Sequence, residues 1–235
     1  MNTYFDYEEL LNARARLKEV FKDPSVVRQS RYFLRSGDEA SFFFDFDIIT
    51  NNPNKCADIV AVLASEINQI VLSKKIDYIA FIEKRSGATV GAIRLAAAIS
   101  METGISNLVV RLNKDLIFER TKLPVVSGIP AWQKLKGAQL ILITDHVSQG
   151  REIIQAVNSV ESLGAKLTDI VTYTLKPLDV KDKMDELFQR DIIVHSVFDI
   201  FDLKNKGNHH YDVTSGGIKN AREEANIPSR LLLSN

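Results

Sequence analysis

The fold is decided by residues 140–163, which read LILITDHVSQG (140–150) and then REIIQAVNSVESL (151–163). The first four residues form a continuous apolar run, which is typical of a strand covered on both faces. After a polar loop, Ile153, Val157 and Val160 recur at helical spacing and Gly164 follows, so a helix is expected over 150–163. A buried strand that leads through a short loop into an amphipathic helix is the repeating unit of a parallel α/β sheet.

The same alternation of helix and strand extends from residue 52 to about residue 200. Asn52 and Pro53 predict the start of a helix whose apolar stripe includes Ile59, Leu63 and Ile67. Strands are expected at Tyr78–Ile82, Leu108–Val110, Leu140–Ile143, Ile170–Tyr173 and Ile192–Val197, with further helices near 90–103 and 179–189. The sequence therefore predicts an α/β fold with a doubly wound, mainly parallel sheet, which binds ligands outside the carboxyl ends of its strands.

The N-terminal region is expected to add a helix and a small β hood to this core. Asp6 and Glu9 have the spacing of a capping box, so a helix should follow Asp6. Tyr32–Leu34 and Ser41–Asp47 read as two short strands joined by a turn. Because no repeat or break in composition divides the chain, we expect one domain over 1–235, with the helix and hood at 1–50, the α/β core at 51–203 and a C-terminal extension at 204–235.

Composition excludes several classes of function. The 235 residues include 30 Lys+Arg and 30 Asp+Glu, so the chain lacks the basic excess expected of a protein that binds duplex DNA. One cysteine, Cys56, excludes an intramolecular disulfide and a multi-cysteine zinc site, and fits a reducing compartment. The first twenty residues lack a secretory signal, and no run approaches about 18 uncharged apolar residues. We therefore expect a cytoplasmic protein without a membrane span.

The segment after the strand at 78–82 is a candidate anion site. It reads EKRSGATVG (83–91) and leads into a helix, so backbone N–H groups, a lysine, an arginine and two glycines come together. A turn with solvated charges is the alternative interpretation. The spacing matches neither the P-loop nor the dinucleotide-binding glycine motif.

The segment after the strand at 140–143 adds a candidate sugar site. Asp145 can accept hydrogen bonds from sugar hydroxyls, while Ser148, Gln149 and Gly150 place N–H groups before a helix, where a phosphate binds. Together these groups suit a ribose 5-phosphate. The alternative is that Asp145 caps the turn and that His146 is an exposed loop histidine.

The two loops together resemble the type I phosphoribosyltransferases. That family has a hydrophobic strand, two adjacent acids, a short Thr/Gly loop and a helix, which bind phosphoribosyl pyrophosphate (PRPP). Phe33-Leu34-Arg35-Ser36-Gly37, followed by Ser41-Phe42-Phe43-Phe44-Asp45, is similar to the start of the orotate phosphoribosyltransferases. The resemblance extends from about residue 30 to residue 203.

The resemblance implies roles for particular residues. The pyrophosphate loop would consist of Glu83, Lys84, Arg85, Ser86 and Gly87. The ribose phosphate would be bound by Asp145, His146, Ser148, Gln149 and Gly150, and the base by Arg35, Phe43, Phe44 and Lys176. For the two phenylalanines, core packing is the alternative.

The implied activity is transfer of ribose 5-phosphate from PRPP to a pyrimidine-type base such as orotate, with release of pyrophosphate. The resemblance also implies that Mg²⁺ arrives with PRPP rather than on protein ligands, and that the protein is a homodimer.

Four departures from the family pattern concern catalysis. His146 stands at the place of the second acid, and the phosphate loop is one residue shorter. The mobile catalytic loop corresponds to Arg111–Ile117, where Arg111 and Lys114 are the cations, and Lys176 falls where the family has an arginine. Losing one contact to the departing pyrophosphate commonly costs about 3 kcal/mol of transition-state stabilisation.

Three hypotheses follow from these departures: an active phosphoribosyltransferase that uses Asp145, Lys114 and Arg111; a catalytically degenerate relative that binds PRPP or a nucleotide as a sensor; and an α/β module whose loops are structural. In the C-terminal extension, His209, His210 and Asp212 could ligate a metal, but a solvated polar tail is the ordinary explanation. A hydrolase triad of Ser148, His146 and Asp145 is disfavoured, because neighbours in one tight loop cannot make sequential hydrogen bonds.

Overall fold

The computed structural model describes residues 6–33, 39–84, 90–112, 126–127, 135–148, 150–176, 181–205 and 208–215. A seven-stranded sheet has the order β5-β4-β3-β6-β7-β8-β9, and β1 and β2 form a separate antiparallel pair. Strands β3, β4, β6, β7 and β8 run parallel, whereas β5 and β9 are antiparallel. The predicted doubly wound, mainly parallel α/β sheet is confirmed.

The elements follow one another largely as the sequence predicts. The strands are β1 Val27–Phe33, β2 Glu39–Phe44, β3 Tyr78–Lys84, β4 Asn107–Leu112, β5 Val126–Ser127, β6 Gln139–Val147, β7 Lys166–Leu175, β8 Ile193–Asn205 and β9 Asn208–Ser215. The helices are α1 Tyr7–Glu19, the 3₁₀ turn η1 Val20–Lys22, α2 Phe46–Thr50, α3 Pro53–Ser73, α4 Val90–Thr103, α5 Arg151–Ser162 and α6 Lys181–Gln189.

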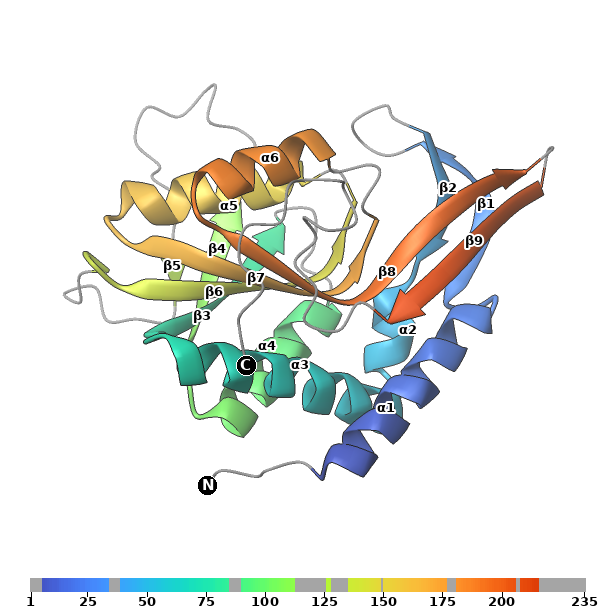
Figure 1. Cartoon of the computed structure of the whole chain (residues 1–235), viewed down its shortest axis with the longest axis horizontal. Helices are drawn as coiled ribbons and strands as arrows, with labels where there is room; N and C mark the ends of the chain where they lie inside the picture. Colours follow the sequence, from blue (N-terminus) through green and yellow to red (C-terminus); the bar gives the residue numbers. More distant parts are fainter. Residues whose placement is uncertain are drawn as a thin grey trace.

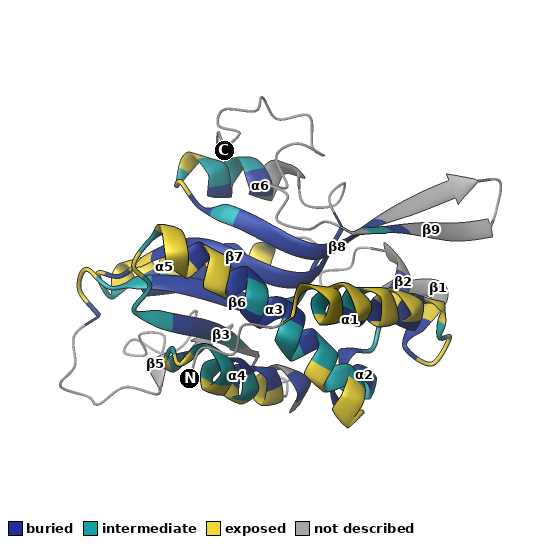
Figure 2. Cartoon of the chain, turned by 60° about the horizontal axis from the view of Figure 1, so that its bottom comes forward, coloured by how far each residue is buried: buried dark blue, intermediate teal, exposed yellow. Residues whose placement is uncertain are grey.

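Helices cover both faces of the large sheet (Figure 1). Helices α5 and α6 lie on one face, and α1, α3 and α4 lie on the other. Strand β6 shows why both faces are apolar: Ile141 and Ile143 belong to the core under α3 and α4, whereas Leu140 and Leu142 belong to the core under α5 and α6. The central strands are accordingly buried along most of their length (Figure 2).

Local sequence signals fix where several helices begin and end. The Asp6 carboxylate accepts a hydrogen bond from the N–H of Glu8, 3.2 Å away, and caps α1. Asn52 caps α3 by accepting from two backbone N–H groups, and Pro53 occupies the first helical position. After α4 and α5 the chain turns at Gly104 and Gly164, both with the positive φ that favours glycine.

An aromatic cluster joins the N-terminal region to the sheet. Phe21 stacks on Phe44 and Tyr173 with ring centroids 5.5 and 6.0 Å apart, and Phe198 meets Phe21 edge-on at 5.3 Å. Phe46 packs against Tyr173 at 5.6 Å. The predicted strand over Ser41–Asp47 is therefore partly wrong: β2 ends at Phe44, and the chain turns into α2 so that Phe46 enters the core.

Two groups of paired charged side chains join elements of the fold: one links two helices, and the other links the end of α3 to the sheet. Arg14 of α1 donates a hydrogen bond to Glu66 of α3, whose exposed fraction is 2%. Burial raises the pKa of Glu66, and the positive charge of Arg14 opposes that shift. On β7, Asp169 accepts from His195 Nε2 at 2.9 Å and from Lys74 Nζ at 2.8 Å. Burial alone would raise the pKa of Asp169, but these two hydrogen bonds, together with one from Thr168 and the electrostatic effect of His195, hold the pKa below its usual value.

The C-terminal part departs most from the sequence expectation. Strand β8 runs to Asn205, beyond the predicted core boundary at residue 203, and returns as β9. His209 and His210 pair with Lys204 and Leu203 in this hairpin, so residues 208–215 form the edge strand of the large sheet. The reason is that antiparallel pairing satisfies the backbone groups of β8 whatever side chains β9 carries.

Helix α3 has the length and apolar composition that would allow it to cross a membrane, although it includes the charged residues Asp58 and Glu66. Within the part of the chain that the structure describes, it is the one such helix. It packs against α1, α4 and β7, with Ile59, Leu63 and Ile67 buried.

Candidate active site

The candidate site lies at the carboxyl end of β6. Asp145 and His146 belong to the strand itself, because β6 continues through Val147 and pairs with β7 up to Leu175. The prediction of a loop directly after Ile143 is therefore wrong: β7 is ten residues long and almost wholly buried, and it extends the pairing of its neighbour. The remaining loop before α5 spans only residues 148–150.

Hydrogen bonds hold these two side chains in place. The Asp145 Oδ1 accepts from the N–H of His146 at 2.9 Å and from the Thr144 hydroxyl at 3.3 Å. The ring Nδ1 of His146 lies 2.7 Å from the Thr174 hydroxyl, which also donates to the Asp145 carbonyl oxygen at 3.3 Å. His146 is thus half-buried and fixed by β7 rather than an exposed loop histidine.

An aromatic ring and a lysine lie beside this pair. Phe42 of β2 is buried and meets the His146 ring edge-on, with centroids 6.2 Å apart. The ammonium group of Lys176, a residue only 8% exposed, lies 5.2 Å from the centroid of the same phenylalanine ring. This distance is within the range of a cation–π interaction. Phe42 therefore links the hood to the ends of β6 and β7.

The resemblance predicts a base site at the two neighbours that follow Phe42 in the sequence, Phe43 and Phe44. Phe43 points to the other side of β2 and is 46% exposed. Phe44 packs on Phe21 and Tyr173 in the aromatic cluster, so its alternative role, core packing, is the one that the structure supports. Phe42 and Thr174 were missed. Side-chain alternation along β2 would have placed Phe42 and Phe44 on one face, but nothing in the sequence pairs His146 with Thr174.

The start of α5 completes the described part of the site. Gly150 is the N-cap residue, with φ 67°, and no side chain caps the helix. First-turn N–H groups of a helix point beyond its start, and there they favour an anion. Ser148 is half-buried between Val147 and this turn. The geometry therefore brings a carboxylate, an imidazole and a helix N-terminus together within six residues, 145–150.

The chain was compared with protein families and with curated proteins. No family model matches the chain. Among curated relatives, it is 22% identical to orotate phosphoribosyltransferase of Pyrococcus horikoshii over 160 residues, which are 68% of this chain and 78% of the relative. It is 25% identical to the orotate phosphoribosyltransferase of Rhodopseudomonas palustris over 166 residues, which are 68% of this chain and 81% of the relative.

Solved structures with a similar fold include the same kind of protein. Orotate phosphoribosyltransferase from Aeropyrum pernix superposes with a TM-score of 0.59 at 17% identity, covering 77% of this chain and 91% of the other. UMP synthase of Leishmania donovani superposes with a TM-score of 0.57 at 21% identity, covering 77% of this chain but 36% of that longer one. The chain has the type I phosphoribosyltransferase fold. At these identities the superpositions establish the architecture, and the substrate has to be argued from the site.

The structure describes the positions of only some of the other residues that the resemblance assigns to the site. Glu83 and Lys84 lie in β3, and Glu83 is opposite Arg111 in the pairing with β4. Because β3 lies between β4 and β6, the end of β3 is next to the strand that carries Asp145, and the end of β4 is one strand further away. Six further expected residues lie outside the described residues: Arg35, Arg85, Ser86, Gly87, Lys114 and Gln149.

The described residues do not form a protein-held metal site. No group of three His, Cys, Asp or Glu side chains comes together among them. Among the described residues, Asp145 is the one carboxylate at the end of β6, and the ring Nδ1 of the neighbouring His146 lies 2.7 Å from the Thr174 hydroxyl. The described residues therefore offer no set of ligands for a resident cation. They do not fit a hydrolase triad either, because the Asp145 carboxylate bonds backbone and hydroxyl donors rather than the ring of His146.

Proposed function

We propose that the protein is a phosphoribosyltransferase, which transfers the ribose 5-phosphate of PRPP to a nitrogenous base and releases pyrophosphate. Orotate is the first candidate base, because the curated relatives named above are orotate phosphoribosyltransferases. The observation that carries the proposal is the position of Asp145 at the end of a central parallel strand, five residues before the uncapped N-cap glycine of α5. We expect a cytoplasmic enzyme.

Asp145 and α5 divide the recognition of ribose 5-phosphate between them. A carboxylate has about four acceptor positions, and in Asp145 two of them are used by the His146 N–H and the Thr144 hydroxyl. The others can accept hydrogen bonds from the ribose hydroxyls. The phosphate would lie at the N-terminus of α5, where Gly150 adopts its left-handed conformation and brings the backbone close to the ligand.

Phe42 and Lys176 have the chemistry to bind the base. A planar heterocycle can pack against a phenylalanine ring, and the ammonium group over that ring supplies a positive charge. An anionic pyrimidine such as orotate matches this pair better than a neutral base does. Lys176 contributes a point charge rather than a bidentate contact, so it selects for charge more than for carboxylate geometry.

Departure of pyrophosphate requires positive charge at the ends of β3 and β4. Lys84 and Arg111, in the last part of these two strands, are proposed as two of the cations. Arg85 and Lys114 are proposed as two more. The backbone of Ser86 and Gly87 is proposed to contact the leaving group. Mg²⁺, when it is bound to PRPP, neutralises part of the pyrophosphate charge. The chain's own contribution is to bind and orient the two substrates and to hold cations beside the leaving group.

A second function is favoured by one observation. At the place where the family carries a second acid, His146 is held by Thr174, so one carboxylate instead of two faces the sugar. A protein altered in this way can retain PRPP binding while its rate of transfer falls, which would make it a sensor of PRPP or of a nucleotide. The two functions differ in turnover and share the binding site.

Calorimetric titration with PRPP, with and without Mg²⁺, tests both functions when it is combined with chromatographic detection of nucleotide formed from orotate, uracil or adenine. Binding and product from the wild type, both lost in Asp145→Asn, would support the enzyme. Heat without product would support the sensor. The matched control is Asp191→Asn, an exposed residue with φ 58° that asparagine tolerates. No heat from the wild type, or an unchanged Asp145→Asn variant, would overturn both functions.

A further inference from the structure

Helix α2 packs closely against the start of α4. On α2, Asp47 Oδ1 accepts a hydrogen bond from the backbone N–H of Gly91, the second residue of α4, over 2.7 Å. Gly91 is buried, and a Cβ atom on it would lie 2.6 Å from the Thr50 hydroxyl and 2.8 Å from Asp47 Oδ1. A side chain at this position would therefore push the two helices apart, and glycine lets them touch.

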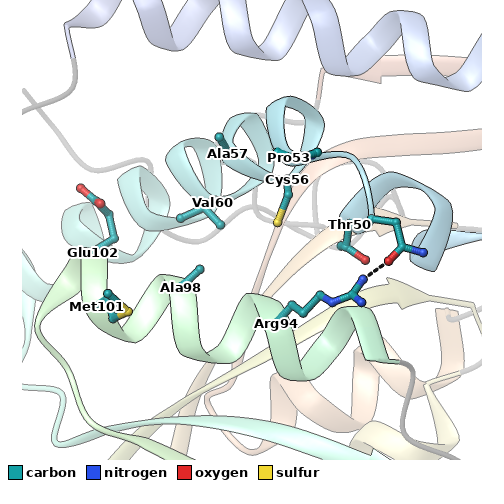
Figure 3. A pocket seen from close by; sticks show the side chains of 10 residues that line it. Thr50, Pro53, Cys56, Ala57, Val60, Arg94, Ala98, Met101 and Glu102 are labelled. Carbon is teal, nitrogen blue, oxygen red and sulfur yellow. Dashed lines mark hydrogen bonds between the residues drawn. The ribbon is translucent and has the colours of Figure 1, made fainter.

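A second contact joins the same two helices about one turn further along α4 (Figure 3). Arg94 donates a hydrogen bond to Asn51, the residue that ends α2. Helix α2 is itself anchored, because Phe46 and Ile49 are buried in the core. A backbone contact and a side-chain contact to one anchored element fix both the position and the direction of the start of α4.

The hydrogen bond from Gly91 changes the interpretation of the segment 83–91. From the sequence, the N–H groups of this segment are expected to bind an anion. First-turn N–H groups have no partner within their own helix, and they favour negative charge. The carboxylate of Asp47 supplies that charge to Gly91 from within the chain. The leaving pyrophosphate is then left chiefly to Lys84 and to residues 85–89.

The start of α4 is also one end of the connection between β3 and α4, which consists of residues 85–89. The other end is fixed by the sheet, in which Lys84 pairs with Leu112 of β4. Asp47 thus holds the one end of this connection that the sheet does not hold. Helix α2 follows β2, the strand that carries Phe42, so a short stretch of chain joins the proposed base side to the proposed pyrophosphate side.

We propose that Asp47 is a positioning residue for phosphoribosyl transfer: it fixes the start of α4 and thereby holds residues 85–89 where they meet the departing pyrophosphate. This inference rests on the proposed function. Asp47 acts through the backbone of α4, and it lowers the cost of ordering the connection when PRPP binds and reacts. Because the contact needs an acceptor atom rather than a charge, asparagine should replace Asp47, whereas alanine should not.

Hydrogen exchange followed by mass spectrometry tests the hold of Asp47 on α4 without any substrate. In Asp47→Ala, the amides of residues 90–95 should exchange about threefold to tenfold faster than in the wild type, because the helix start loses its acceptor and opens more often. Asp47→Asn should resemble the wild type. The amides of α5 are the internal control and should be unchanged in both variants. Wild-type exchange over residues 90–95 in Asp47→Ala would overturn the proposal.

Steady-state kinetics with PRPP and orotate test the role in transfer. In Asp47→Ala, kcat should fall about tenfold or more while the KM for PRPP changes less, because the held connection matters most as the leaving group departs. Asp47→Asn should recover most of kcat. The matched control is Asp58→Ala, which breaks a contact between two other helices, the ion pair of Asp58 with Arg16, and should leave kcat unchanged.

Two results would overturn the positioning role: a wild-type kcat in Asp47→Ala, or an Asp47→Asn variant as impaired as Asp47→Ala. If the wild type binds PRPP without turnover, calorimetry makes the same comparison, and the Kd for PRPP should be about threefold weaker or more in Asp47→Ala alone. A wild type that binds no PRPP would overturn the proposed function and the role in transfer together, whereas hydrogen exchange would still show whether Asp47 holds α4.

Discussion

Replacing Arg14 with methionine should destabilise the protein because it leaves a carboxylate buried without its charge partner. Among the described residues Arg14 is the donor to Glu66 Oε1, and Glu66 Oε2 has no hydrogen-bond partner. Glu66 is 2% exposed, so water cannot replace the guanidinium group. Breaking a buried ion pair from one side costs about 3–5 kcal/mol. We expect the free energy of unfolding of Arg14→Met to fall by that amount at neutral pH.

The same substitution should change how stability depends on pH. Burial raises the pKa of Glu66 while Arg14 opposes the shift, so removing Arg14 should raise the pKa further. A carboxyl group with a higher pKa in the folded state binds its proton more tightly there, so it stabilises the fold at low pH. That contribution is lost as the pH rises above about 4.3, the usual glutamate value. The unfolding free energy of Arg14→Met should therefore decrease by up to about 1.4 kcal/mol per pH unit until the folded-state pKa is passed.

Urea unfolding followed by circular dichroism from about pH 5 to pH 8, at one protein concentration, measures both effects. The double variant Arg14→Met/Glu66→Met removes both charges, and because apolar replacement of a buried pair is often neutral or stabilising, it should recover most of the loss. A loss below about 1 kcal/mol in Arg14→Met, or a double variant no more stable than the single one, would refute the reasoning.

Three further substitutions have defined outcomes. Asp169→Asn removes a carboxylate whose pKa is lowered in the fold. The wild type should lose this stabilisation as the pH falls below about 3.9 and through the lower folded-state pKa. The variant should be about 3–5 kcal/mol less stable at neutral pH by urea unfolding, and it should lose less on acidification. Gly91→Ala places a Cβ 2.6 Å from the Thr50 hydroxyl and should cost about 1–3 kcal/mol, seen as a lower Tm; an unchanged Tm would show that the neighbouring helix can shift. Gly150→Ala, strained at φ 67° by about 1–2 kcal/mol, should weaken PRPP binding in calorimetry more than Asp191→Asn does.

The parallel core could be predicted from the sequence because its signals are local. Continuous apolar runs such as Leu140–Ile143 identify strands buried on both faces, and caps such as Asn52 fix where helices begin. The ends of the strands could not be predicted in the same way. Asp145 and His146 are polar, and they continue β6 only because β7 is long enough to pair with them. Strand length in a sheet is therefore set partly by a neighbour distant in the sequence.

Contacts between side chains that are distant in the sequence could not be predicted either. Glu66 interrupts an otherwise apolar stretch of α3, which could have signalled a buried partner, but nothing in the sequence identifies Arg14, 52 residues earlier, as that partner. At the site, the contact of Phe42 with His146 requires the hood to lie over β6, an arrangement that no local pattern encodes. The acid predicted from the sequence, Asp145, was placed at the expected strand; its neighbours came from the tertiary structure.

The aromatic cluster draws its rings from both ends of the chain. Phe21 and Phe44 precede almost the whole α/β core, whereas Tyr173 and Phe198 come from two of its last strands. Contacts between segments so far apart must close long loops, and a large share of such non-local contacts slows folding. On the ribosome the N-terminal residues emerge first, and α1 and the hood must wait with their apolar faces exposed until β7 and β8 have been synthesised. The aromatic side chains of η1 and the hood therefore complete their packing only after β7 and β8 have been synthesised.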